Sequence, residues 1–207
     1  GMMPFKNEYR PYLEHYWYPG YQNTISWRHA SDPEWNWKGA SSSDQTVGQM
    51  FALTLLAQYM DDEGIRKRAI RLMDELMSHI IDHDLRLVDH DGRATLWGIW
   101  HPEYVNRFPE MVGDRKLYAS NIIAFLQTAW HFTGKEKYKK VAEDLLYHQG
   151  YLKNLVRPFS TIGKAPANAD DWSKMLSQSW NHSDDEMYFL AYWGLYPYAF
   201  SDSLKEQ

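Results

Sequence analysis

The most regular feature of the chain is an alternation between nearly all-apolar segments and amphipathic segments, each long enough to form a helix. In VGQMFALTLLAQYM (47–60), apolar residues cover most of a helical circumference, which is typical of a buried helix. The following segment, from Ile65 to Ile81, repeats apolar residues at helical spacing between charged residues, which predicts an amphipathic outer helix. The two segments together predict an inner helix paired with an outer one.

A second pair follows the first. LYASNIIAFLQTAWHFTG (117–134) is mostly apolar, and KEKYKKVAEDLLYHQG (135–150) is amphipathic. Each ends at a glycine, which is common just beyond the last turn of a helix. Residues 151–180 contain prolines and are expected to form a long loop with one short helix near 172–176. WNHSDDEMYFLAYWGLYPY (180–198) then predicts a third apolar helix, whose SDD start resembles the SD start of the first.

Two segments interrupt this helical pattern. LRLVDHDGRATLW (85–97) alternates in character around Asp91-Gly92, which predicts a small β-hairpin with a two-residue turn. Residues 1–39 carry four prolines and many aromatic residues without a helical period, so we expect an irregular aromatic arm that packs over the helices. The chain is therefore predicted to be one all-α domain, residues 1–207, of antiparallel helical hairpins with one small β-hairpin.

The composition adds one unusual figure, an aromatic content of 16% with 10 Trp and 15 Tyr. Such rings suit a surface that stacks on sugars, but they also fill the space between helices, and both interpretations remain open. The net charge of -5 and the lack of a concentrated basic face argue against nucleic acid as a partner. With no Cys, disulfides and thiolate metal sites are excluded.

No apolar run is long enough to span a bilayer, and the start of the chain lacks the apolar core of a signal peptide. We therefore expect a soluble protein without a membrane partner. Whether its compartment is the cytoplasm or the periplasm stays open.

Four carboxylates are candidates for chemistry: Asp44, Glu103, Asp184 and Asp185. Glycoside hydrolysis generally needs two carboxyl groups across the scissile bond. The alternative for the three aspartates is structural, because an Asp at a helix start caps backbone N–H groups and favours the helix dipole. Glu103 lies in a loop where no helix requires it. We therefore expect Asp44 and Glu103 to be the catalytic pair.

The loop after the hairpin is expected to shape the substrate site, together with the start of the third apolar helix. The predicted substrate-binding residues are Trp97, Trp100, His101, Tyr104, Trp180, Asp184 and Asp185.

Two Asp-His-Asp triplets, at 82–84 and 89–91, have the residue types of a metal site. The twelve-residue calcium loop with its distal Glu is absent, however, and no HExxH motif occurs. A helix end and a hairpin turn explain the two triplets without an ion. We expect no metal and no cofactor.

Three stretches, SSSDQTVGQMFAL, DHDLRLVDHDGRATLWGIWHPEY and WNHSDDEMYFLAYW, resemble bacterial members of the six-hairpin glycosidase superfamily, the (α/α)6 toroids. The resemblance implies a cleft over the N-terminal ends of the inner helices, lined by Trp, Tyr and acidic residues. Asp44 and Asp184 or Asp185 match such positions. Three hairpins are half of a toroid, so a partial or open toroid is expected. Its uncovered apolar faces predict a homodimer or coverage by the aromatic arm.

Two functions follow from these expectations. The first is a carbohydrate-active protein of the glycoside hydrolase type, which binds a glycan in an aromatic, acidic cleft. The second is a non-catalytic helical module that binds a glycan or a protein.

Overall fold

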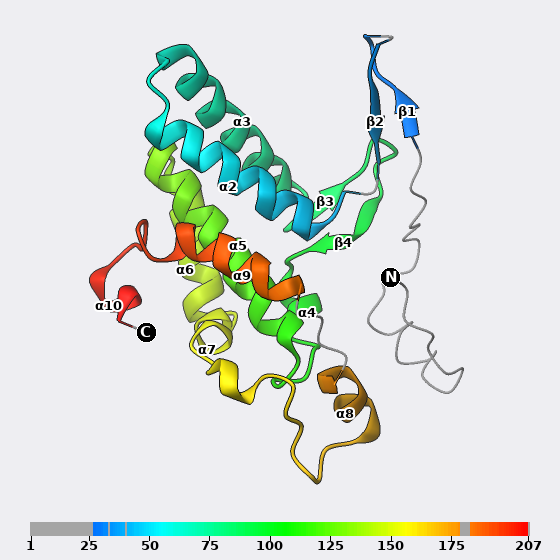
Figure 1. Cartoon of the computed structure of the whole chain (residues 1–207). Helices are drawn as coiled ribbons and strands as arrows, with labels where there is room; N and C mark the ends of the chain where they lie inside the picture. Colours follow the sequence, from blue (N-terminus) through cyan, green and yellow to red (C-terminus); the bar gives the residue numbers. More distant parts are fainter. Residues whose placement is uncertain (1–26, 33, 40, 179–182, 207) are drawn as a thin grey trace.

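The computed structural model describes residues 27–206 except 33, 40 and 179–182, and this part of the chain is mostly helical (Figure 1). The elements in order are β1 (Trp27–His29), β2 (Asn36–Lys38), α2 (Ser43–Tyr59), α3 (Glu63–Asp82), β3 (Arg86–Val88), β4 (Ala94–Ile99), α4 (Pro102–Val105), α5 (Gly113–Thr133), α6 (Glu136–Tyr147), α7 (Tyr151–Leu155), the 3-10 turn η2 (Phe159–Thr161), α8 (Asp171–Gln178), α9 (Ser183–Leu195) and α10 (Asp202–Lys205). The helices predicted from periodicity correspond to α2, α3, α5, α6, α8 and α9.

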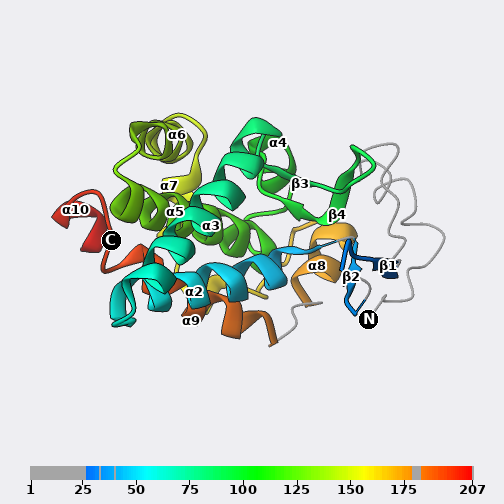
Figure 2. The same ribbon diagram turned by 90° about the horizontal axis from the view of Figure 1, so that it is seen from above.

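Helix α5 is the centre of the molecule. Every residue from Lys116 to Ala129 is buried. The helix contacts α2, α3, α6, α7 and α9, and Figure 2 shows α6 and α9 on its opposite sides. A helix that is apolar nearly all round can lose its contact with water only if neighbours cover every face, which is the situation of α5. Gly134, with a φ of 67°, ends the helix in the left-handed conformation that the sequence indicated.

Helix α2 is less buried than its sequence predicted. Val47, Met50, Thr54 and Ala57 face the core, whereas Ala52 is exposed. Helices α3, α5 and α9 contact α2, and α2 keeps a solvent face. The prediction that α2 is buried on all sides was wrong. Apolar residues around a helix show which of its faces could be buried, but they do not show whether a neighbouring element covers each face.

The predicted β-hairpin is formed by the antiparallel strands β3 and β4. Its turn is longer than the two residues expected. The Asp89 N–H donates to the Arg93 carbonyl over 2.8 Å, which leaves three residues between them. Gly92, the last of the three, has a φ of 78°, as a three-residue hairpin loop requires.

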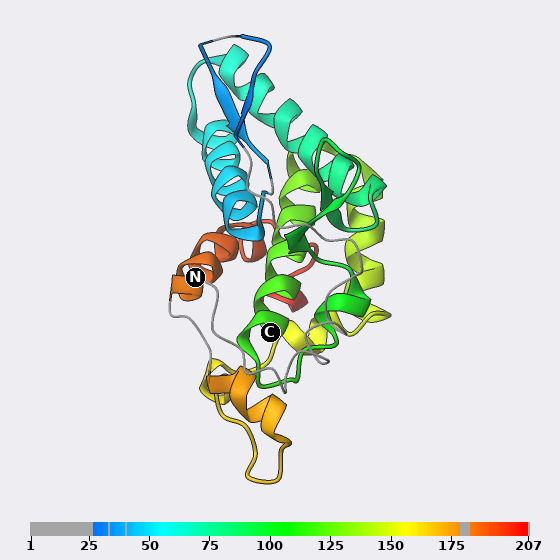
Figure 3. The same ribbon diagram turned by 90° about the vertical axis from the view of Figure 1, so that its right-hand side faces the viewer.

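A second hairpin was not predicted. Strands β1 and β2 pair antiparallel, with Trp27 opposite Lys38 and His29 opposite Asn36, inside the segment expected to be irregular. Figure 3 shows this hairpin and α8 projecting from opposite ends of the helical body. The rest of the aromatic arm, residues 1–26, lies outside the described residues, so its predicted packing over the helices stays a prediction.

Helix α9 packs against both α5 and α2. Its inner face is close-fitting: a Cβ added at Gly194 would lie 2.6 Å from the Thr128 hydroxyl and 2.9 Å from the Ala124 carbonyl oxygen. Its outer face carries an exposed stripe at helical spacing, here called the α9 stripe. Its members are Phe189, Tyr192, Trp193 and Tyr196. Within the described residues, no helix combines the length and apolarity that crossing a bilayer requires.

We expect Gly194→Ala to lower the free energy of unfolding by about 1–3 kcal/mol, because the new methyl group would push α9 away from backbone atoms of α5 that cannot give way. Gly48→Ala is the matched control, since a Cβ there meets nothing within 4 Å. It should be neutral or raise stability by up to about 1 kcal/mol. Urea unfolding of both variants checks this, and equal effects would argue against the close α5–α9 contact.

Candidate functional site

The three inner helices begin in the same way. Each has an aspartate as its second residue: Asp44 in α2, Asp114 in α5 and Asp184 in α9. The three are spaced at equal intervals of 70 residues along the chain. The three helices start at the same end of the helical body (Figures 1 and 2). We call these residues, together with Asp185, the acidic cluster.

The carboxylates of the acidic cluster act on one another electrostatically. Burial, and then the negative charge of Asp184, raise the pKa of Asp114 to about 6. Burial, and then the charges of Asp185 and Asp44, raise the pKa of Asp184. Asp184 is therefore coupled to both of the other inner-helix aspartates. Like charges near one another in a partly dry site disfavour full ionisation, so the cluster holds a proton more readily than isolated aspartates do.

In α2 and α5 the N-cap residue is not the aspartate of the acidic cluster. The residue before the first turn of α2 is Ser42, whose backbone N–H donates to Gln45 Oε1 over 3.2 Å, and Asp44 accepts a hydrogen bond from the Ser42 hydroxyl. In α5 the corresponding residue is Val112. Asp114 has no cationic partner in the described part of the chain, although part of the residue reaches solvent.

Two buried tyrosines adjoin the acidic cluster. Tyr188 of α9 donates its hydroxyl proton to the Gly113 carbonyl over 2.8 Å, which ties the start of α9 to the start of α5. Burial, and then Asp114, raise the pKa of both Tyr188 and Tyr118. The Ser43 side chain hydrogen-bonds Tyr118, which links α5 to α2. Both tyrosines therefore stay protonated, and each hydroxyl can donate one hydrogen bond and accept others.

A polar stripe continues into the core behind the acidic cluster. Asp114, Tyr118 and Asn121 occupy one face of α5 at intervals of four and three residues. Asn121 is fully buried, and neither side-chain polar atom has a hydrogen-bond partner within the described residues. An unsatisfied buried amide costs about 1–3 kcal/mol. A fold that keeps this stripe is not optimised for stability alone.

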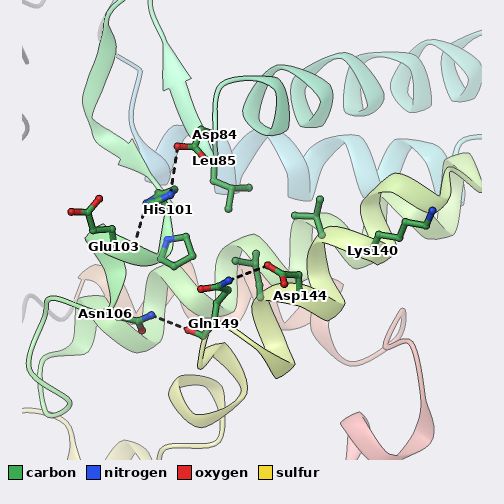
Figure 4. A pocket seen from close by; sticks show the side chains of 11 residues that line it. Asp84, Leu85, His101, Glu103, Asn106, Lys140, Asp144 and Gln149 are labelled. Carbon is green, nitrogen blue, oxygen red and sulfur yellow. Dashed lines mark hydrogen bonds and ion pairs between the residues drawn. The ribbon is translucent and has the colours of Figure 1, made fainter.

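Glu103 and His101 belong to a different place. They line a groove between α4 and α6, shown in Figure 4, and Asp44 does not. Glu103 forms an ion pair with Arg107, one turn further along the chain. His101 Nδ1 accepts the Glu103 N–H over 3.2 Å, and its Nε2 lies 3.5 Å from Asp84. The charge of Asp44 acts on Asp184, whereas Glu103 lines the groove between α4 and α6, so the pairing of Asp44 with Glu103 stays a prediction.

The predicted aromatic residues divide into core and surface. Trp100 is 0% exposed and Tyr104 is 3% exposed, so neither ring offers a face to a ligand. Their expected stacking on a sugar does not fit this burial. Trp97, on β4, is 42% exposed, and β4 contacts α2. Trp180 lies outside the described residues.

The Asp-His-Asp triplets have local partners. Asp84 pairs with Arg86, and Asp91 pairs with Arg93 over 2.6 Å. Within the described residues, no three His, Asp or Glu side chains are grouped so that they could hold a metal ion. The triplets therefore serve the helix end and the hairpin loop.

Sequence reasoning missed Asp114, Tyr118 and Tyr188 as site residues. Asp114 is followed by Arg115 and Lys116, so its segment reads as an exposed charged run. The equal spacing of Asp44, Asp114 and Asp184 was the signal that could have identified it.

Comparisons with known proteins do not add to this geometry. No protein-family model, curated protein or solved structure matches the chain.

Asp114→Asn should stabilise the protein at pH 8. The folded pKa of Asp114 is raised above its unfolded value of 3.8, so the stability it contributes is present at low pH and is lost as pH rises through about 6. The asparagine variant avoids that loss, by on the order of 2–3 kcal/mol at pH 8 and nearly nothing at pH 4. Chemical unfolding at both pH values measures it, with Asp171→Asn, exposed in the first turn of α8, as the control. A pH-independent difference would contradict the burial of Asp114.

Proposed function

We propose that the chain is a carbohydrate-active protein that hydrolyses a glycosidic bond at the acidic cluster. The observation that carries this proposal is the coupling of carboxylates at the starts of three inner helices, one of which, Asp114, has a pKa of about 6. Glycoside hydrolysis needs one carboxyl group that is protonated and a second that is ionised. Unequal surroundings supply that difference from chemically identical side chains.

In this proposal Asp114 is the general acid. Its carboxyl proton passes to the glycosidic oxygen as the bond to the sugar breaks, and a pKa near the working pH favours that transfer. Asp44, which is exposed in the first turn of α2, is the ionised partner that activates water or attacks the sugar carbon. Asp184 lies close enough to act on both and helps to keep Asp114 protonated.

The surroundings support a sugar as the substrate. The start of α2 is flanked by the β1–β2 and β3–β4 hairpins (Figures 1 and 2), and exposed Trp97 lies on β4. An indole ring stacks on the C–H face of a pyranose. Acidic residues at the N-terminal ends of the inner helices agree with the resemblance to six-hairpin glycosidases, so we propose membership of that superfamily with a partial or open toroid. Helix α9 contacts α2 as well as α5, so a partial or open toroid would have to include both of these contacts.

A screen against chromogenic glycosides and polysaccharides tests the proposal. We expect Asp114→Asn to lower kcat/KM roughly 10²–10⁴-fold, since the substitution removes the proton and keeps the shape. Asp44→Asn should lower it at least as much. In the wild type, kcat/KM should fall above pH about 6 as Asp114 ionises. The control is Glu63→Gln, which changes an acid in the first turn of an outer helix and should leave the activity unchanged.

Three results would contradict this proposal. They are no turnover across the panel, Asp114→Asn activity equal to that of the wild type, or a loss of activity in Glu63→Gln as large as the loss in Asp114→Asn. If Asp44→Asn is fully active while Asp184→Asn is inactive, the ionised partner is Asp184.

A second candidate function is a non-catalytic binding module, and the α9 stripe favours it. Phe189 of α9 is 73% exposed, and Tyr196, just beyond the end of α9, is 63% exposed. Exposed apolar patches of this kind mark interaction surfaces. The homodimer expected from the sequence would bury the stripe.

Light scattering tests the homodimer. We expect a dimer mass for the wild type and a monomer mass for the double variant Phe189→Glu with Tyr196→Glu, because each charge would have to be buried in the interface. Trp35→Glu, at an exposed position in the turn between β1 and β2, is the control and should stay dimeric. A wild-type monomer at all concentrations rules the homodimer out.

A further inference from the structure

The groove between α4 and α6 is a large concave feature of the described residues that the proposed reaction does not use. It has a volume of about 820 Å³ and lies between the end of α3, α4, α6 and the turn before α7 (Figure 4). This volume is within the range of small-molecule sites, about 300–1,000 Å³. None of the acidic-cluster residues lines it.

The backbone that forms one wall of the groove is strained. Asp84 and Leu85 have φ values of 56° and 58°, consecutive left-handed conformations that each cost on the order of 1 kcal/mol or more outside glycine. The turn that they make places the Asp84 carboxylate 3.5 Å from His101 Nε2, at the mouth of the groove in Figure 4. Leu85 is held in the core beneath, where its N–H donates to the Ile80 carbonyl over 2.8 Å. Strain of this kind persists where the surroundings enforce one geometry.

The charges around the groove are largely compensated. Asp84 pairs with Arg86, and Glu103 pairs with Arg107. On the α6 side, Asp144 accepts a hydrogen bond from the Gln149 amide over 3.3 Å. These carboxylates keep lone pairs that can accept further hydrogen bonds. Because Asp84 and Glu103 are paired with arginines, they add little net charge to the groove. A free anion would meet three acidic groups, and the arginine partners of Asp84 and Glu103 reduce the attraction of the groove for a cation.

Donors and apolar surface complete the lining. Lys140 of α6 lines one end of the groove, is exposed, and has no ion-pair partner within the described residues. Val141 and Leu145, on the same helix, supply apolar surface beside it. Carboxylate acceptors, ammonium and amide donors and an apolar floor match a ligand that is neutral, carries several hydroxyl groups and has C–H faces. That is the chemistry of a neutral saccharide.

We propose that this groove is a second, non-catalytic binding site for a short neutral oligosaccharide, separate from the acidic cluster. It takes in Glu103 and His101, the residues that the sequence indicated for the glycan site. The choice of a saccharide rests on the proposed function, whereas the location rests on the groove alone. A chain that holds a glycan at two places keeps the polymer near its reaction centre, because the second contact is intramolecular once the first has formed.

The test measures the binding of neutral trisaccharides of glucose, xylose, mannose and N-acetylglucosamine. Calorimetry gives the affinity, and NMR shifts of the Asn106 and Gln149 side-chain amides locate the site. At least one trisaccharide should shift both amides. Lys140→Ala should weaken its binding several-fold, and Val141→Trp, which fills the groove, at least tenfold. Lys139→Ala is the matched control on the same helix, outside the lining, and should bind as the wild type does.

Asp114→Asn separates the two proposals. It should abolish hydrolysis and leave trisaccharide binding at the groove unchanged. The groove proposal is overturned if no saccharide shifts the two amides, if Val141→Trp binds as tightly as the wild type, or if Asp114→Asn alone abolishes the binding. If a saccharide binds at the groove but no hydrolysis is detected, the proposed reaction is contradicted and the second binding site is not.

Discussion

The burial of α5 is the constraint on which the rest of the structure depends. A run from Lys116 to Ala129 without an exposed residue must be covered on all sides, and α2, α3, α6, α7 and α9 each cover part of it. The contact with α9 is close enough to require Gly194. Helices α2, α5 and α9 start at the same end of the helical body. The packing that buries the core therefore also brings their first turns together, and with them Asp44, Asp114 and Asp184.

At those first turns two electrostatic effects oppose each other. The dipole at a helix N-terminus stabilises an ionised carboxylate by about 0.3–1 kcal/mol. The rise of the Asp114 pKa from 3.8 to about 6 corresponds to a net effect of about 3 kcal/mol in the other direction. Burial and the neighbouring Asp184 therefore outweigh the dipole, and Asp114 keeps its proton up to a pH of about 6. Buried Asn121, without a hydrogen-bond partner in the described part of the chain, adds to the cost of this region.

Periodicity was sufficient to predict the long helices α2, α3, α5, α6 and α9, and the Asp91-Gly92 dipeptide was sufficient to predict the β3–β4 hairpin. Local patterns could not show which apolar faces find a neighbour, so α2 was expected to be more buried than it is, and the toroid stays a proposal. For the same reason Trp100, expected at the surface of a loop, is in the core, since its surroundings come from α5, including Phe125 at 5.9 Å. The expected pairing of Asp44 with Glu103 depended on how the chain folds back after α2, which local sequence patterns do not determine. Asp114 was overlooked because its neighbours Arg115 and Lys116 resemble a solvated run.

The central claim is that the carboxyl of Asp114 is buried and coupled to Asp184 at the starts of the inner helices. A carbon-13 NMR titration of the aspartate carboxyl groups, in the wild type and in Asp184→Asn, measures this directly. The structure predicts that Asp114 titrates near pH 6 in the wild type and at a lower pH in Asp184→Asn, where one neighbouring charge is gone. A wild-type Asp114 that titrates near 4, and does not respond to the loss of Asp184, would contradict the claim.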